Sequence, residues 1–168
     1  MSILKRVIED IDSAIERDPA TNGRLEMFLT APGLHAVWMH RVASFIFHKL
    51  RWRIVARMFA QWARLITGIE IHPAAKIGRR LFIDHGMGVV IGATAIVGDD
   101  VLMYHGVTLG GKTLERGVKR HPTIGNNVVL GAHSIILGDI KVGDGARIGA
   151  QAIVTKNVKA GATVVGKF

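Results

Sequence analysis

Apolar and charged positions in the first part of the chain alternate with a helical period. Between Ile3 and Ile15 the apolar residues recur every three or four positions, and Lys, Arg, Glu and Asp fill the positions between them. This spacing places the apolar side chains on one face of an α-helix. Similar patterns continue to Ile66, and Gly68 has the residue type that commonly follows a helix C-terminus. The pattern predicts an α-helical N-terminal domain over residues 1–67.

Local sequence signals divide this helical region. Asp18 precedes Pro19, a pair that suits an N-cap and the first position of a helix, so a short helix is expected over 19–30. A longer helical stretch is expected over 34–66, with an interruption near 51–53. Its arginines and tryptophans suit either a membrane surface or contact with neighbouring subunits. We favour the contact with neighbouring subunits.

After Gly68 the hydrophobic period changes to six. An aliphatic residue occupies the first position of each six-residue unit, and a small or apolar residue occupies most fifth positions. The first positions are Ile71, Ile77, Ile83, Ile91, Val97, Met103, Leu109, Ile124, Leu130, Ile136, Val142, Ile148, Val154 and Ala160. Each unit can form one short strand and one turn, and three units close a triangular coil.

This period defines the expected fold class. We expect an N-terminal α-helical region followed by a left-handed parallel β-helix of hexapeptide repeats over residues 68–168. Prisms of this repeat class wind left-handed, in contrast to the usual right-handed crossover. Residues 111–122, GKTLERGVKRHP, interrupt the repeat with a polar and basic segment. This segment must leave the prism as a loop, and ejected loops of solenoids often carry their function.

Composition and charge narrow the function classes. The chain has no cysteine, which excludes disulfides, thiolate zinc sites and cysteine nucleophiles. With 22 Lys and Arg against 13 Asp and Glu, the formal net charge is +9, so phosphate-bearing small molecules and polyanions are attracted. The N-terminus lacks a signal-peptide pattern, and no apolar stretch has the roughly 20 residues that cross a membrane. We therefore expect a soluble, cytoplasmic protein.

One pair of residues in the repeat region suits acid–base chemistry. Glu70 and His85 are separated by 15 positions, close to the roughly 18 residues of one coil, so they are expected near the same corner of adjacent coils. A carboxylate beside an imidazole fixes the tautomer of the ring and stabilises its protonated form, as general-base catalysis requires. An ion pair that only stabilises the first coil is the alternative interpretation.

Four short motifs, taken in order, are more specific. They are DPA at 18–20, IDHG at 83–86, GVTLGG at 106–111 and RHP at 120–122. Together with the repeats they resemble the serine O-acetyltransferase family over nearly the whole chain. The resemblance implies transfer of an acetyl group from acetyl-CoA to the hydroxyl of L-serine, giving O-acetylserine for cysteine biosynthesis.

The resemblance also implies residue roles. His85 would be the general base, with Glu70 as its acidic partner. Two carboxylates near the ammonium group of serine and two basic residues facing its carboxylate would hold the substrate. These four residues are Asp18, Asp84, Arg120 and His121. No metal is implied.

The same resemblance implies how acetyl-CoA and the subunits are arranged. Acetyl-CoA would lie as co-substrate between neighbouring prisms of a homotrimer, with a hexamer as a second arrangement. Small residues would contact it or supply backbone N–H groups to the oxyanion, and two lysines would meet its phosphates. The small residues are Gly110, Gly111, Gly131, Ala132 and Ala150, and the lysines are Lys141 and Lys156. Some members use a terminal Ile to dock into cysteine synthase, and Phe168 gives that partnership little support.

The sequence leaves three other interpretations of the function open. A different hexapeptide-repeat acyltransferase would keep the fold and act on a sugar or xenobiotic hydroxyl. A metal hydratase would hold zinc with His85, His105 and His133 across a subunit seam. A non-catalytic scaffold would use the positive charge to bind polyanions, although no nucleic-acid motif is present. We expect neither nucleic acid nor membrane as a partner.

Overall fold

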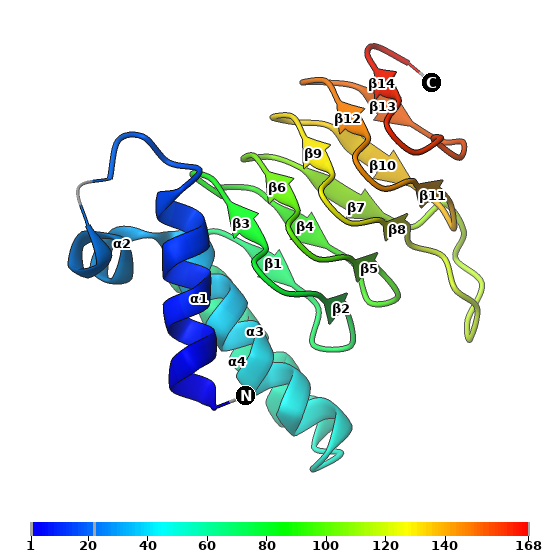
Figure 1. The fold of residues 1–168 in the computed structure, drawn as a ribbon. Helices are drawn as coiled ribbons and strands as arrows, with labels where there is room; N and C mark the ends of the chain where they lie inside the picture. The colour runs from blue at the N-terminus through cyan, green and yellow to red at the C-terminus, as the bar shows by residue number, and fades with distance from the viewer. Residues whose placement is uncertain (1, 22, 168) are drawn as a thin grey trace.

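The computed structural model describes residues 2–21 and 23–167, which form a helical end and a triangular prism (Figure 1). The helices are α1 (Ile3–Ile15), α2 (Arg24–Thr30), α3 (Pro32–His48) and α4 (Arg53–Thr67). The expected interruption near 51–53 is confirmed, since Arg51 has a φ of 60° between α3 and α4. The short helix begins later than expected. Asp18 accepts hydrogen bonds from the Ala20 amide and the Thr21 hydroxyl, which closes a turn instead of starting a helix at Pro19.

Parallel strands of two or three residues form three sheets, one on each side of the prism. Sheet A contains β1 (Glu70–Ile71), β4 (Val90–Ile91), β7 (Thr108–Gly110), β10 (Ile135–Leu137) and β13 (Ile153–Val154). Sheet B contains β2 (Lys76–Ile77), β5 (Ile96–Val97), β8 (Thr123–Ile124) and β11 (Lys141–Val142). Sheet C contains β3 (Phe82–Ile83), β6 (Leu102–Met103), β9 (Val129–Leu130), β12 (Arg147–Ile148) and β14 (Thr163–Val164). The predicted left-handed parallel β-helix is confirmed.

The six-residue period produces this core directly. Each inward first position stacks on its equivalent in the next coil, as Ile71 does on Ile91 and Ile91 does on Leu109. Except for Ile77, which is partly buried, and Ala160, these residues are fully or almost fully buried, and backbone hydrogen bonds join each coil to the next. The last predicted inward position was wrong. Ala160 is exposed, and Val158 instead bridges to Val142, because the final turn is two residues shorter than the repeat.

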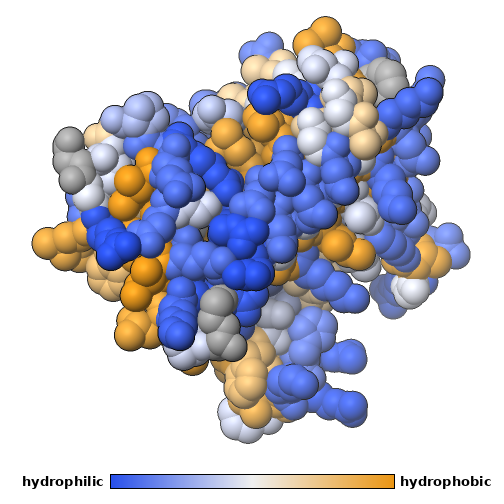
Figure 2. Space-filling model, in the orientation of Figure 1, coloured by the Kyte–Doolittle hydropathy of each residue, from blue (hydrophilic) through white to orange (hydrophobic). Residues whose placement is uncertain are grey.

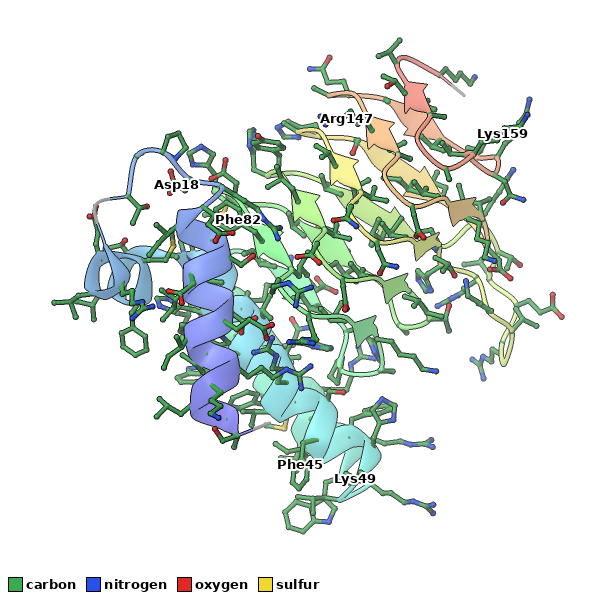
Figure 3. All side chains as sticks on the ribbon, viewed as in Figure 1. Asp18, Phe45, Lys49, Phe82, Arg147 and Lys159 are labelled. Carbon is green, nitrogen blue, oxygen red and sulfur yellow. The ribbon has the colours of Figure 1, made fainter. Side chains whose placement is uncertain are left out.

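The helices cover the first coil. Ala36 and Val37 of α3 belong to the same buried cluster as the inward residues of the prism. On the outer face of sheet C, Phe82 is 5% exposed because α1 and the segment after it pack over its ring (Figure 3). Burying this ring removes a large apolar surface from water, which fixes α1 against sheet C.

Helix α4 presents its large apolar residues outward. Its buried face consists of small residues, including Ala56 and Ala60, while Ile54, Met58 and Leu65 are exposed. Figure 2 shows further apolar patches over α1 and α2. An exposed apolar face of this kind marks an interaction surface. Across residues 2–21 and 23–167, no helix combines the length and the apolar character that spanning a membrane requires.

Candidate active site

The predicted site residues lie at two edges of sheet A. We call the turns from sheet C to sheet A the first corner, which comprises 84–89, 104–107, 131–134 and 149–152. The turns from sheet A to sheet B form the second corner, which comprises 72–75, 92–95, 111–122 and 138–140. The ejected loop predicted at 111–122 follows β7 and precedes β8, so it leaves the prism at the second corner (Figure 1).

His85 lies at the first corner in a strained backbone conformation. Its φ is 58°, in the left-handed region, and the turn is held by hydrogen bonds from Asp84 N to Met103 O and from Gly86 N to Asp84 O. The imidazole is 75% exposed, and its Nε2 lies 3.9 Å from Oδ1 of Asp84. This turn has six residues, two more than the other turns of the first corner, and it projects an accessible imidazole away from the prism, with a carboxylate nearby.

Asp18 approaches the same corner from a distant part of the sequence. It follows the C-terminal end of α1 (Figure 3). Hydrogen bonds from the Thr21 hydroxyl and the Ala20 amide hold the pKa of Asp18 below its ordinary value, and the charge of His85 acts in the same direction. An ionised carboxylate beside the imidazole is suited to bind a cation such as an ammonium group.

Glu70 lies next to this turn but has another partner. Its backbone N–H donates to Val89 O, in the turn that carries His85, as expected for adjacent coils at one corner. Its carboxylate forms an ion pair with Nη1 of Arg64 at 3.2 Å, and the described contacts include none with His85. Glu70 as the partner of His85 stays a proposal.

Two further histidines continue along the first corner. The ring centroids of His85 and His105 are 5.9 Å apart, and those of His105 and His133 are 4.9 Å apart, both pairs near perpendicular. Within the part of the chain that the structure describes, no group of three His, Cys, Asp or Glu side chains is arranged to hold a metal ion. The zinc interpretation therefore receives no support from these three residues within one chain.

His121 lies at the second corner and is 7% exposed. Its ring packs against Gly92, where a Cβ atom would lie only 2.0 Å from the ring. The backbone N–H of Thr94 donates to His121 Nδ1 at 3.2 Å, so the proton of the neutral ring is on Nε2. Burial lowers the pKa of His121, and the charges of Arg120 and Lys119 lower it further. His121 is therefore a neutral hydrogen-bond donor near pH 7.

Thr94 orders the end of the ejected loop. Its Oγ1 accepts hydrogen bonds from the backbone N–H groups of Arg120 and His121, at 3.0 and 3.1 Å, and lies 2.8 Å from His121 Nδ1. Sequence reasoning missed this residue. The sequence offers one signal for it, its position at the second corner one coil before the loop. A threonine at such a position is not distinctive enough to predict a role.

The two corners are too far apart to hold one serine within a single chain. The His121 ring packs on Gly92, whereas His85 lies before Gly88. Four residue steps at about 3.3 Å each separate Gly88 from Gly92, which is roughly 13 Å along the strand. A single amino acid such as serine spans only about 3.8 Å, the distance between consecutive Cα atoms, so one serine cannot reach both corners. The structure thus brings Asp18, Asp84 and His85 together and leaves Arg120 and His121 at the other edge of sheet A.

The small residues expected to contact acetyl-CoA also divide between the corners. Gly131 and Ala132 lie in the same first-corner turn as His133, and Ala150 lies in the turn of the next coil, where a Cβ on Gly131 would be 2.5 Å from Ala150 N. Gly110 instead ends β7 and Gly111 begins the second corner, where the Cβ position of Gly111 is 3.3 Å from Arg120 Cδ. Lys141 is in sheet B and Lys156 follows β13, so neither lysine is at the first corner.

Comparisons with known proteins place these features in a family. The bacterial transferase hexapeptide (six repeats) family model matches residues 121–156. A serine acetyltransferase of Staphylococcus epidermidis is 53% identical over 164 residues, which cover 98% of this chain and 76% of that protein.

Solved structures show the same likeness. The serine acetyltransferase of Neisseria gonorrhoeae in complex with serine superposes with a TM-score of 0.91 at 39% identity, covering 98% of this chain and 66% of that one. The enzyme of Brucella abortus in complex with coenzyme A gives a TM-score of 0.93 at 39% identity, covering 97% of this chain and 64% of that one. The chain thus spans slightly less than two thirds of each solved chain.

Proposed function

The chain belongs to the serine acetyltransferase family, which transfers the acetyl group of acetyl-CoA to the hydroxyl of L-serine, and we propose that this chain does so with His85 as its general base. The observation that carries the role of His85 is its accessible imidazole on a strained turn with Asp18 and Asp84 beside it. The product, O-acetylserine, leads to cysteine. Both substrates are cytoplasmic metabolites, and we propose the cytoplasm as the location of the reaction.

The proposed reaction needs one proton acceptor and no covalent enzyme intermediate. His85 takes the proton of the serine hydroxyl as the oxygen attacks the thioester carbonyl carbon. The tetrahedral intermediate then collapses, the carbon–sulfur bond breaks, and the leaving CoA sulfur takes the proton from His85. Imidazole suits both steps because its ordinary pKa is near neutral. Glu70, once turned from Arg64 toward His85, would stabilise the imidazolium.

Serine would be held by charges at both of its ends. Asp18 and Asp84, at the first corner, would bind the ammonium group. Arg120 and the Nε2–H of His121, at the second corner, would bind the carboxylate through charge-assisted hydrogen bonds. Since these corners lie at opposite edges of sheet A, the first corner of one subunit would meet the second corner of its neighbour.

We therefore propose a homotrimer, with a hexamer as the second arrangement. The outward apolar face of α4, which includes Ile54, Met58 and Leu65, supports contact between subunits. In such an assembly Gly110 and Gly111 of one subunit would approach His85 of the next, where backbone N–H groups could stabilise the oxyanion. Phe168, on which the expectation about cysteine synthase depends, lies outside the described residues.

Acetyl-CoA would run along the first corner. Gly131, Ala132 and Ala150 leave room there for an extended pantetheine arm, because none carries a side chain larger than a methyl group. The net charge of +9 favours a ligand with several phosphates. In this arrangement the thioester reaches His85 at the head of the corner.

Thiol release from acetyl-CoA tests the proposal. The purified chain is assayed with L-serine, without any acceptor, and with a panel of sugars. We expect release that depends on L-serine and yields O-acetylserine by mass spectrometry. Release that depends on a sugar and not on L-serine would instead support the alternative hypothesis, an acyltransferase that acts on a sugar hydroxyl. A folded protein that releases no thiol with any acceptor would refute the proposal.

A further inference from the structure

Arg17 connects the end of α1 to the prism through a dense set of hydrogen bonds. Its Nη2 donates to Ser13 Oγ at 2.8 Å and to Asp100 Oδ1 at 3.0 Å. Its Nη1 donates to the carbonyl oxygens of Arg80 at 3.2 Å and Val101 at 3.5 Å. One guanidinium thus joins a helix to two successive coils.

The acceptors lie on a rigid part of the prism. Arg80 and Asp100 lie in the turns from sheet B to sheet C and have φ values of 52° and 59°. Arg80 also donates to both carboxylate oxygens of Asp100. Its hydrogen bond holds the pKa of Asp100 below the ordinary value. Asp100 is therefore an ionised and well-ordered acceptor for Arg17, and bidentate contacts of this kind fix geometry.

Arg17 is followed immediately by Asp18, the carboxylate beside His85. The backbone N–H groups of Arg17 and Asp18 both donate to Ala14 O, at 3.0 and 2.9 Å, so the two residues continue the last turn of α1 together. Asp18 then begins the turn closed by Thr21. A displacement of Arg17 would move Asp18 with it, because one short rigid segment carries both.

We infer that Arg17 is a positioning residue: by fixing the end of α1 on the prism it places the Asp18 carboxylate at the first corner, and so sets the affinity for the ammonium group of serine. Arg17 itself touches neither substrate. The inference rests on the proposed function, in which Asp18 binds that ammonium group.

The rest of α1 has other anchors, which makes the role of Arg17 local. Glu9 pairs with Arg79 and Arg80 on the same prism edge. Ile11 and Ala14 pack with Phe82 over sheet C. These contacts remain when Arg17 is replaced, so α1 stays docked while the segment after it loses its attachment.

The test compares Arg17→Met with Arg24→Met in the purified full chain. Methionine keeps the aliphatic stem and removes every donor of Arg17. We expect the KM for L-serine to rise by about tenfold, while kcat and the KM for acetyl-CoA change by less than about threefold. Arg24→Met removes a neighbouring arginine whose ion pair with Asp12 lies on the surface, and it should leave all three constants unchanged.

A merely structural role would give a different result. Partial unfolding of Arg17→Met would lower kcat in proportion to the active fraction and leave the KM for serine as it was, and that outcome would overturn the inference. Arg17→Lys should recover part of the serine affinity, because one ammonium can still reach Asp100 but cannot satisfy all the acceptors. Should Arg17→Met fail to fold, Asp100→Asn removes the charged acceptor and should raise the same KM, and an unchanged KM would overturn the inference.

Asp18→Asn separates failure of the inference from failure of the proposed function. If Asp18→Asn raises the KM for serine and Arg17→Met does not, the positioning role is wrong and the ammonium site stands. If Asp18→Asn has no effect, the ammonium site is wrong, and the positioning role falls with it. The double variant should bind serine no worse than Asp18→Asn alone, whereas additive effects would show that Arg17 acts elsewhere.

Discussion

Replacing Thr94 by valine should disconnect the end of the ejected loop without changing the shape of the side chain. The hydroxyl accepts from the amides of Arg120 and His121 and bonds to the Nδ1 of the imidazole. Each of these three hydrogen bonds contributes a net stabilisation of about 1 kcal/mol to folding. Because the site is half-buried, water can replace part of the lost hydrogen bonding. We expect the free energy of unfolding to fall by about 2 kcal/mol.

The same change should weaken serine binding, since Thr94 orients both residues proposed to face the serine carboxylate. We expect the KM for L-serine to rise by about tenfold or more, with a smaller change in kcat. Urea unfolding at fixed protein concentration measures the first effect, and steady-state thiol release measures the second.

Thr163→Val is the matched control. Thr163 is exposed on β14, so its replacement should change the free energy of unfolding and both kinetic constants very little. A Thr94→Val enzyme that is less stable yet has an unchanged KM for serine would refute the proposed role of the loop end in binding. An enzyme unchanged in both respects would refute the hydrogen-bond reasoning itself.

Three further predictions concern the base, the packing of α1 and the pH dependence. His85→Asn should lower kcat by about 100- to 10,000-fold with an unchanged urea midpoint, and near-normal turnover would exclude His85 as the base. Phe82→Ala should lower the free energy of unfolding by about 3–5 kcal/mol, whereas Phe45→Ala, at an exposed position, should cost far less; equal losses in urea titrations would contradict the packing argument. Burial lowers the pKa of His40 to about 4, below its unfolded value, so the unfolded state binds the proton first and stability should fall as the pH drops from about 6.5 to 4. Burial also lowers the pKa of His72 to about 4, so His40→Gln should reduce that slope in unfolding measurements without removing it, and an identical slope would assign it to other groups.

Several features of the prism could be predicted because each depends on a short stretch of chain. An aliphatic residue every sixth position, as at Ile71 and Ile77, places one inward side chain in each strand, and the coils then stack in register. The break in that period predicts the loop after Gly110. The motif IDHG identified Asp84 and His85 as candidate residues for the chemistry, and their roles remain proposals.

The structural predictions were wrong where the six-residue period was interrupted, or where a local sequence signal was compatible with two structures. Asp18-Pro19 is compatible with a helix start and with a turn, and the Thr21 hydroxyl decided for the turn. Ala160 fits the six-residue spacing of the sequence, but a shorter final turn brings Val158 inward instead. Neither outcome depends on hydrophobic spacing, so spacing could not predict it.

The sequence by itself therefore determined the repeat and most of its inward residues, and it marked candidate side chains for the chemistry, because these are properties of neighbouring residues along the chain. Only the tertiary structure decided which of them meet. The hydrogen bond from Arg17 to Asp100 attaches the end of α1 to the prism, Asp18 lies close enough to His85 for their charges to interact, and Arg120 and His121 lie at the opposite edge of sheet A. Such contacts join residues that are far apart in the chain, and they follow from how the helices dock on the prism, which no periodic pattern records.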